Sequence, residues 1–260
     1  MRETTDGGFP PGTIVVAAGI EPRVYEFLTS LMGVIVPLGT RLLIERSCDI
    51  TQNFNQGVQK MTGEWVWFLG DDHAFSPHLL MRLLRFNQDV VVPITPCKTP
   101  PWAPCVMHGP VWSEKMPLYT WSELSGMGLL ELPKGDFIGQ AGMLVKKPVL
   151  GRIGYPWFKC GQMDPGRLQE DLTFCRELQT LGYKVMVDQE SIFDHYVPFC
   201  VTARKHQGVW APALKTSDDV VVVLPDAGTQ IPTATEYIGK ERVKWVSEES
   251  DVEVIGYERD

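Results

Sequence analysis

The chain alternates between short apolar runs and longer segments in which apolar residues recur every three or four positions. Apolar runs of strand length, bounded by Gly, Pro or charged residues, are typical of buried strands. These runs cover residues 12–18, 34–37, 41–45, 65–69 and 89–93. Segments with helical spacing cover residues 21–32, 51–61 and 76–86, the last starting at Ser76 as N-cap and Pro77 as first helical residue. This order predicts an α/β fold with a mainly parallel sheet and helices on both faces.

The middle of the chain interrupts this alternation. Residues 95–128 are rich in Pro, Trp and Met, so few regular elements are expected there. The aromatic content argues against disorder. We therefore expect an ordered loop region, which either helps to line a pocket or simply packs on the core.

Periodicity returns in the second half. A strand follows the glycines of residues 135–146, and residues 148–153 and 168–181 have helical patterns. Strands are predicted at residues 183–187 and 191–193. In the tail, residues 218–224, 243–246 and 252–257 read as short strands, which predicts a small β-rich appendage.

Composition narrows the class of protein. The chain has 260 residues, 44% of them hydrophobic, which suffices for one large domain or a domain with an appendage. No apolar run is long enough to span a membrane and the N-terminus has no signal-peptide pattern, so we expect a soluble, cytoplasmic protein. The net charge of −8 argues against a dedicated nucleic-acid binder. Six Cys residues show no zinc-site spacing, and reduced thiols are expected.

Two adjacent carboxylates, Asp71 and Asp72, directly follow the apolar run 65–69. In open α/β sheets, ligands bind at the carboxyl ends of the strands. Adjacent carboxylates repel each other unless a cation joins them, and a divalent metal is the usual solution. The same residues also form ordinary turns, so the pair alone leaves both interpretations open.

The order of further motifs resembles a GT-A-fold glycosyltransferase of the family 2-like class. The resemblance runs from about Thr13 to Tyr196 and predicts a glycosyltransferase domain over residues 1–204, with residues 205–260 as the appendage. The motifs that carry it are an Asn-containing helix (Asn53, Asn55), the strand from Gly63 to the Asp71–Asp72 pair, a Gly-x-x-Gly segment (Gly139, Gly142), the Glu170–Asp171 pair and His195.

By this resemblance, Asp72 and His195 hold Mn²⁺ or Mg²⁺, and a His ligand favours Mn²⁺. Asp171, beside Glu170, is expected to be the general base, kept ionised by the positive end of its helix. A single displacement assisted by such a base inverts the anomeric configuration, although relatives with similar motifs retain it. One departure stands out, because Gly70 occupies the place of the first acid in the family's Asp-x-Asp motif.

The resemblance also places the substrates. The nucleotide is expected over the end of the first strand, on Ala18, Glu21, Arg46, Asn55 and Asp71. Gly142 allows close backbone approach to a sugar, and Trp157 offers an aromatic platform; a backbone bulge and core packing are the respective structural alternatives.

The expected donor is a nucleotide-sugar, with a UDP-sugar favoured. A protein, a glycan, a small molecule or a modified nucleobase remains open as acceptor. Two other classes also remain: a non-catalytic nucleotide-sugar-binding protein, which the missing acid at Gly70 favours, and a nucleotidyltransferase, for which residues 17–22 are a poor match.

Overall fold

The structure is a computed structural model of the chain. It describes residues 1–19, 25–47, 49–99, 102–109, 117–163, 166–196, 200–206, 209–215, 221–223, 243–246 and 253–256. Among these residues, no helix has both the length and the apolar character needed to cross a bilayer.

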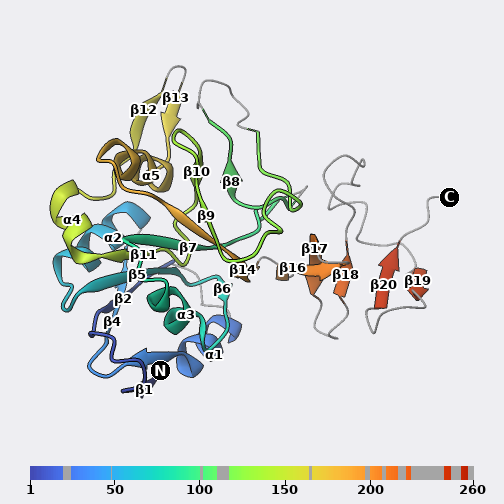
Figure 1. Ribbon diagram of the computed structural model, residues 1–260, viewed down its shortest axis with the longest axis horizontal. Helices are drawn as coiled ribbons and strands as arrows, with labels where there is room; N and C mark the ends of the chain where they lie inside the picture. Colours follow the sequence, from blue (N-terminus) through green and yellow to red (C-terminus); the bar gives the residue numbers. More distant parts are fainter. Residues whose placement is uncertain are drawn as a thin grey trace.

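A seven-stranded sheet forms the centre of the fold (Figure 1). Its order is β4 (Arg41–Arg46), β2 (Thr13–Ala18), β5 (Trp65–Gly70), β11 (Leu144–Lys146), β7 (Val90–Ile94), β14 (Met186–Ile192) and β9 (Leu129–Glu131). Strands β4, β2, β5, β7 and β14 run in one direction, whereas β11 and β9 run in the other. The predicted mainly parallel sheet is confirmed, and β11 enters as an antiparallel strand in its middle.

Helices cover both faces of this sheet, as predicted (Figure 1). The helices are α1 (Tyr25–Gly33), α2 (Ile50–Gln59), α3 (Leu79–Arg85), α4 (Lys147–Ile153) and α5 (Glu170–Thr180). Because side chains alternate along a strand, Val15 of β2 joins the apolar cluster under α2, α4 and α5. Its neighbour Ile14 joins the cluster under α1 and α3 on the opposite face.

Two helix starts differ from the sequence expectation. Helix α3 begins at Leu79, because Ser76 forms a turn before it: its Oγ accepts a hydrogen bond from the His78 N–H, and its carbonyl accepts one from the Leu79 N–H. Helix α5 begins at Glu170 rather than at residue 168, which lies in strand β13. The start of the first helix lies outside the described residues, which resume at Tyr25.

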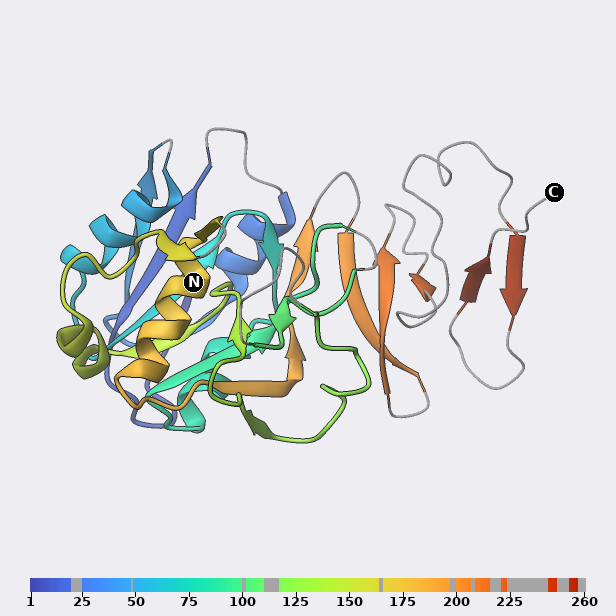
Figure 2. The same ribbon diagram turned by 90° about the horizontal axis from the view of Figure 1, so that it is seen from above.

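A second sheet adjoins the first, and the sequence patterns predicted one of its strands, within residues 218–224. Its order is β18 (Val221–Val223), β17 (Val209–Lys215), β16 (Cys200–His206), β15 (Asp194–Tyr196) and β6 (His73–Ala74). Figure 2 shows β16 to β18 extending away from the central sheet. The expected boundary between residues 204 and 205 falls inside β16, so that strand belongs to both proposed parts of the chain.

The remaining strands are short. They pair as β1 (Arg2–Thr4) with β3 (Ile35–Pro37), β8 (Val106–Met107) with β10 (Phe137–Ile138), β12 (Gly161–Met163) with β13 (Gly166–Leu168), and β19 (Val243–Val246) with β20 (Glu253–Gly256). The three strands expected in the tail therefore occur, as β18, β19 and β20.

The Pro- and Trp-rich segment is ordered where the structure describes it. An antiparallel bridge joins Pro96 to Pro104, so residues 95–99 run antiparallel to residues 102–105, and we call these two paired segments the hairpin. Trp102 and Trp121 are fully buried, and the Trp121 indole N–H donates a hydrogen bond to the Trp102 carbonyl. The hairpin is thus fixed to the core.

Candidate active site

The cavity at the carboxyl ends of β5 and β7 is lined by four residues that the sequence singled out for metal binding or catalysis: Asp72, Glu170, Asp171 and His195. It has a volume of about 310 Å³. Glu170 and Asp171 come from the start of α5. The other lining residues are Ile50, Phe54, Gly70, His73, Pro93, Thr95, Lys98, Cys105, Ile138, Gly139, Gln140, Ala141 and Gln169. The Pro-rich segment therefore contributes to the lining of this cavity.

The two adjacent carboxylates after β5 serve different partners. Asp71 accepts a hydrogen bond from the Gly19 N–H at 2.8 Å, which ties the ends of β5 and β2 together. Asp72 contacts His73 Nδ1 at 2.8 Å, His195 Nε2 at 3.5 Å and the Lys98 ammonium. Burial would raise the pKa of Asp72, but its contacts with His195, His73 and Lys98 outweigh this and hold the pKa far below the usual value. Asp72 is therefore a permanent anion.

His73 and His195 reach Asp72 because β6 and β15 pair. The two residues are direct partners in this antiparallel ladder, and their rings stack with centroids 4.3 Å apart. The Tyr196 N–H also donates to the Asp72 carbonyl, which holds β15 against the turn. Burial lowers the pKa of His73, so its ring is neutral. This pairing explains why residues more than a hundred positions apart converge.

The tautomer of His195 is set by the hairpin. Its Nδ1 lies 2.8 Å from the Pro96 carbonyl oxygen. A carbonyl only accepts, so Nδ1 carries the hydrogen and the other ring nitrogen, Nε2, offers a lone pair when the ring is neutral. This Nε2 is buried without a hydrogen bond to any residue that the structure describes. A buried nitrogen with a free lone pair, next to a carboxylate, is suited to bind a metal ion.

Asp72, His73 and His195 together fit a divalent transition metal. One ligand atom from each residue lies within 4.8 Å of the others. One carboxylate oxygen with imidazole nitrogens suits Mn²⁺ better than Mg²⁺, which prefers oxygen. The hydrogen bond from His195 to Pro96 is the kind of outer contact that orients a metal-bound His.

Gly70, which stands where the family's motif has its first acid, lies close to Asp72 and His73. A Cβ on Gly70 would lie 3.0 Å from Asp72 Oδ1 and 3.1 Å from His73 Nδ1. A side chain at position 70 would therefore require one of these two side chains to shift by a few tenths of an ångström.

Asp171 faces the cavity from the first turn of α5. Burial, with a smaller contribution from the neighbouring Glu170, raises the pKa of Asp171 to about 6. This corrects one expectation, since burial outweighs the helix terminus that was expected to keep the carboxylate ionised. Asp171 is still mostly ionised at neutral pH, and a pKa closer to 7 makes it a better proton acceptor.

Gly139 lets the cavity extend to Asp171. A Cβ there would meet Cys105 Sγ at 3.1 Å and Asp171 Oδ2 at 3.6 Å.

Gly142 has a structural role in the backbone. Its φ is +76°, and a Cβ would overlap the Pro93 ring at 2.6 Å, so it is needed for the turn before β11 and does not line the cavity.

The residues expected to hold the nucleotide separate into groups. Ala18 and Arg46 are paired at the ends of β2 and β4, on the edge where the nucleotide was expected. Glu21 lies outside the described residues. Asn55 is buried and both ends of its side-chain amide are hydrogen-bonded to the backbone of Phe158. The amide N–H donates to the Phe158 carbonyl at 2.7 Å, and the amide oxygen accepts from the Phe158 N–H at 3.0 Å. That internal pairing gives Asn55 a structural role in place of the expected nucleotide contact.

Trp157 is also placed differently from the expectation. Its indole N–H donates to the Leu150 carbonyl of α4, and its ring packs against the large apolar cluster. It does not line the cavity, so the structure supports the core-packing alternative.

Sequence reasoning missed several polar groups in the cavity, among them His73, Lys98 and Cys105. The position of His73 directly after Asp72 could have indicated that His73 is a further candidate metal ligand. Lys98 and Cys105 lie in the Pro-rich segment, where no periodicity assigns a side chain to a face.

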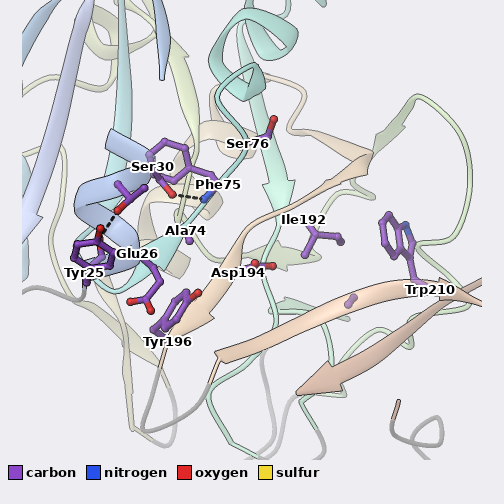
Figure 3. Close-up of a pocket in the computed structure, with 12 residues that line it drawn as sticks. Tyr25, Glu26, Ser30, Ala74, Phe75, Ser76, Ile192, Asp194, Tyr196 and Trp210 are labelled. Atoms are coloured by element: carbon purple, nitrogen blue, oxygen red, sulfur yellow. Dashed lines mark hydrogen bonds between the residues drawn. The ribbon is translucent and has the colours of Figure 1, made fainter. Parts of the chain in front are cut away.

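A larger cleft, of about 440 Å³, lies on the other face of the β6–β15 ladder (Figure 3). Asp194 and Tyr196 line it, while His195 between them faces the cavity. Figure 3 shows Tyr25, Glu26 and Tyr196 together at one end and Trp210 at the other. The described residues of this cleft do not include the metal-ligand set, so we assign the chemistry to the smaller cavity.

A comparison with known protein families covers part of this site. Residues 43–123 match the family described as glycosyl transferase family 2, a stretch that contains α2, β5, the Asp71–His73 turn and Lys98. The resemblance seen in the sequence is confirmed over these residues, and the mixed α/β fold with its large central sheet is consistent with GT-A. A domain of this family supports glycosyl transfer in general.

The search of curated proteins gave no match. Among 82 matching chains of solved structures is the crystal structure of A197 from STIV. It is 14% identical, with a TM-score of 0.46, and the match covers 85% of this chain and 98% of that one.

Proposed function

Starting from the glycosyl transferase family 2 segment at residues 43–123, we propose that the protein transfers a sugar from a nucleotide-sugar, with a UDP-sugar favoured, to an acceptor hydroxyl. The observation that carries this proposal is the meeting of Asp72, His195 and Asp171 around one cavity. A metal-binding group and a buried base in the same cavity are what this chemistry requires.

Asp72 and His195 would hold Mn²⁺, with His73 as a third ligand. Mg²⁺ is a poorer match to imidazole nitrogens. When bound, the ion supplies positive charge where the diphosphate leaving group becomes more negative. The end of β2, with Ala18 and with Gly19 tied to Asp71, would receive the nucleotide.

Asp171 would act on the acceptor. Its carboxylate takes the proton of the acceptor hydroxyl as that oxygen attacks the anomeric carbon, and the bond from this carbon to the diphosphate breaks. A single displacement of this kind inverts the anomeric configuration. The raised pKa of Asp171 supports the role, because a stronger base accepts the proton more readily.

The alternative is a binding protein without turnover, which the missing acid at Gly70 favours. Asp72, His73 and His195 lie close enough together to hold a metal without an acid at position 70, and this supports the transferase.

The test is to incubate the protein with several UDP-sugars and Mn²⁺ and to measure UDP release. We expect release that stops with a chelator and in Asp72→Asn but persists in Asp89→Asn, a change at an exposed acid. Binding of the UDP-sugar without release of UDP, even with a range of acceptors, would support a binding protein instead.

A further inference from the structure

Among the described residues that line the cavity, Lys98 is the one Lys or Arg, and it has no role in the proposal above. Its ammonium contacts Asp72 Oδ2, the carboxylate assigned to the metal. The side chain is about half exposed, at 48%, and lines the cavity. It therefore has room to move within the site.

The backbone that carries Lys98 is held firmly. The Cys97 N–H donates to the Ala103 carbonyl at 2.8 Å, and the Cys105 N–H donates to the Thr95 carbonyl at 2.7 Å. Pro96, two residues before Lys98, accepts the hydrogen bond from His195. The base of the hairpin is thus tied both to its own partner strand and to the metal-ligand set.

Charge decides what Lys98 does when a metal binds. In the structure the ammonium and the Asp72 carboxylate neutralise each other. A divalent ion on Asp72 repels a second cation a few ångströms away. The ammonium is then displaced from Asp72 and is free to pair with another anion that enters the cavity.

We propose that Lys98 is a diphosphate-binding residue, which gives up Asp72 when the metal binds and moves to the phosphates of the donor. This inference rests on the proposed function. The diphosphate of a nucleotide-sugar carries two negative charges. The metal ion and a released Lys98 together present a complementary positive charge. A lysine suits this task because its flexible stem carries a compact charge between two partners.

Lys98→Met tests the proposal, because it keeps the length of the side chain and removes the charge. Lys184→Met is the matched control, since Lys184 also forms an ion pair but lies exposed beside Glu131. The readouts are Mn²⁺ affinity without nucleotide, from electron paramagnetic resonance, and UDP affinity at saturating Mn²⁺, from calorimetry. A thermal melt checks that each variant folds.

We expect Lys98→Met to bind Mn²⁺ about three- to tenfold more tightly, because the competing cation is gone. We expect it to bind UDP about tenfold more weakly, the usual scale for one charge-assisted contact. Lys98→Arg, which keeps the charge, should retain UDP binding within about threefold of wild type, and it serves as the informative variant if Lys98→Met does not fold. Lys184→Met should change neither affinity.

Two results would overturn the role of Lys98. Unchanged UDP affinity in Lys98→Met, with or without tighter Mn²⁺ binding, would leave Lys98 as a surface ion pair only. A loss of UDP affinity in Lys98→Arg as large as in Lys98→Met would show that shape rather than charge matters. A wild-type protein that binds neither Mn²⁺ nor UDP would instead overturn the proposed function itself.

Discussion

His195 Nδ1 lies 2.8 Å from the main-chain oxygen of Pro96, and this contact joins two parts of the active site. It leaves the other ring nitrogen, Nε2, for the cluster around Asp72. It also anchors the hairpin from which Lys98 reaches the same carboxylate. This hydrogen bond therefore links the orientation of the proposed metal ligand to the segment that carries a nearby cation.

Replacing His195 by Ala should weaken Mn²⁺ binding at least about tenfold, because one of the assigned ligands is lost. The affinity can be measured by calorimetry in the absence of nucleotide. His78→Ala is the control, since His78 is exposed before α3 and makes no capping hydrogen bond. Equal Mn²⁺ affinity in the two variants would remove His195 from the ligand set.

Asp171→Asn should fold, bind the donor with near-native affinity and transfer sugar at least about a hundredfold more slowly. Asn keeps the size of the side chain but cannot take the proton of the acceptor. Single-turnover kinetics on a preformed donor complex separates the two effects, with Glu177→Gln on the same helix as control. Near-native transfer by Asp171→Asn would move the base assignment to Glu170.

The raised pKa of Asp171 predicts a pH dependence of the rate. The base must be ionised, so kcat should fall as the pH drops through about 6, and this limb should vanish from the residual activity of Asp171→Asn. A wild-type rate that stays level from pH 7 to pH 5, well below that pKa, would show that the carboxylate is not the base.

The same pKa predicts an effect on stability. A carboxyl whose pKa is raised by folding lowers the free energy of unfolding only where it is ionised. Below its unfolded pKa, near 4, it is protonated in both states and has no such effect. The decrease in the free energy of unfolding grows between pH 4 and 6 and reaches its full size above pH 6. Asp171→Asn should therefore raise the free energy of unfolding by about 1–3 kcal/mol at pH 8 and change it little at pH 4. Urea unfolding at both pH values tests this sign.

The two glycines of the Gly-x-x-Gly segment should respond differently to Ala. Gly139→Ala places a methyl between Cys105 and Asp171 and should lower kcat/KM about ten- to a hundredfold, with a small change in Tm. Gly142→Ala strains a left-handed backbone and overlaps Pro93, so it should lower the unfolding free energy by at least about 1–3 kcal/mol. The reverse pattern would contradict both assignments.

Asn55→Ala should destabilise the fold by about 2–5 kcal/mol, because it leaves the N–H and the carbonyl of Phe158 unpaired in the core. Gln52→Ala, on the exposed side of the same helix, should have little effect. UDP affinity at a temperature where both variants are folded should match wild type. A specific loss of UDP affinity would restore the nucleotide-contact role expected from the sequence.

The sequence by itself determined the features that depend on local pattern. Apolar runs predicted the main strands of the central sheet, and helical spacing predicted the helices on its two faces. The position of Asp71 and Asp72 after β5 placed a site at the carboxyl edge of the sheet, since strand ends are visible in the pattern. Asp171 at a helix start was visible for the same reason.

Only the tertiary structure decided which of these groups meet. The pairing of β6 with β15 brings His73 and His195 to Asp72, and the Pro-rich hairpin adds Lys98. Asn55 and Trp157 pack in or against the core. Asn55 bonds to the backbone of Phe158, far along the chain, and the Trp157 indole bonds to the nearby Leu150 carbonyl. Local patterns reflect the repeat of a helix or strand, whereas contacts between distant segments depend on how elements pack, and packing has no period along the chain. That is why the edge of the sheet could be predicted and the partners of each side chain could not.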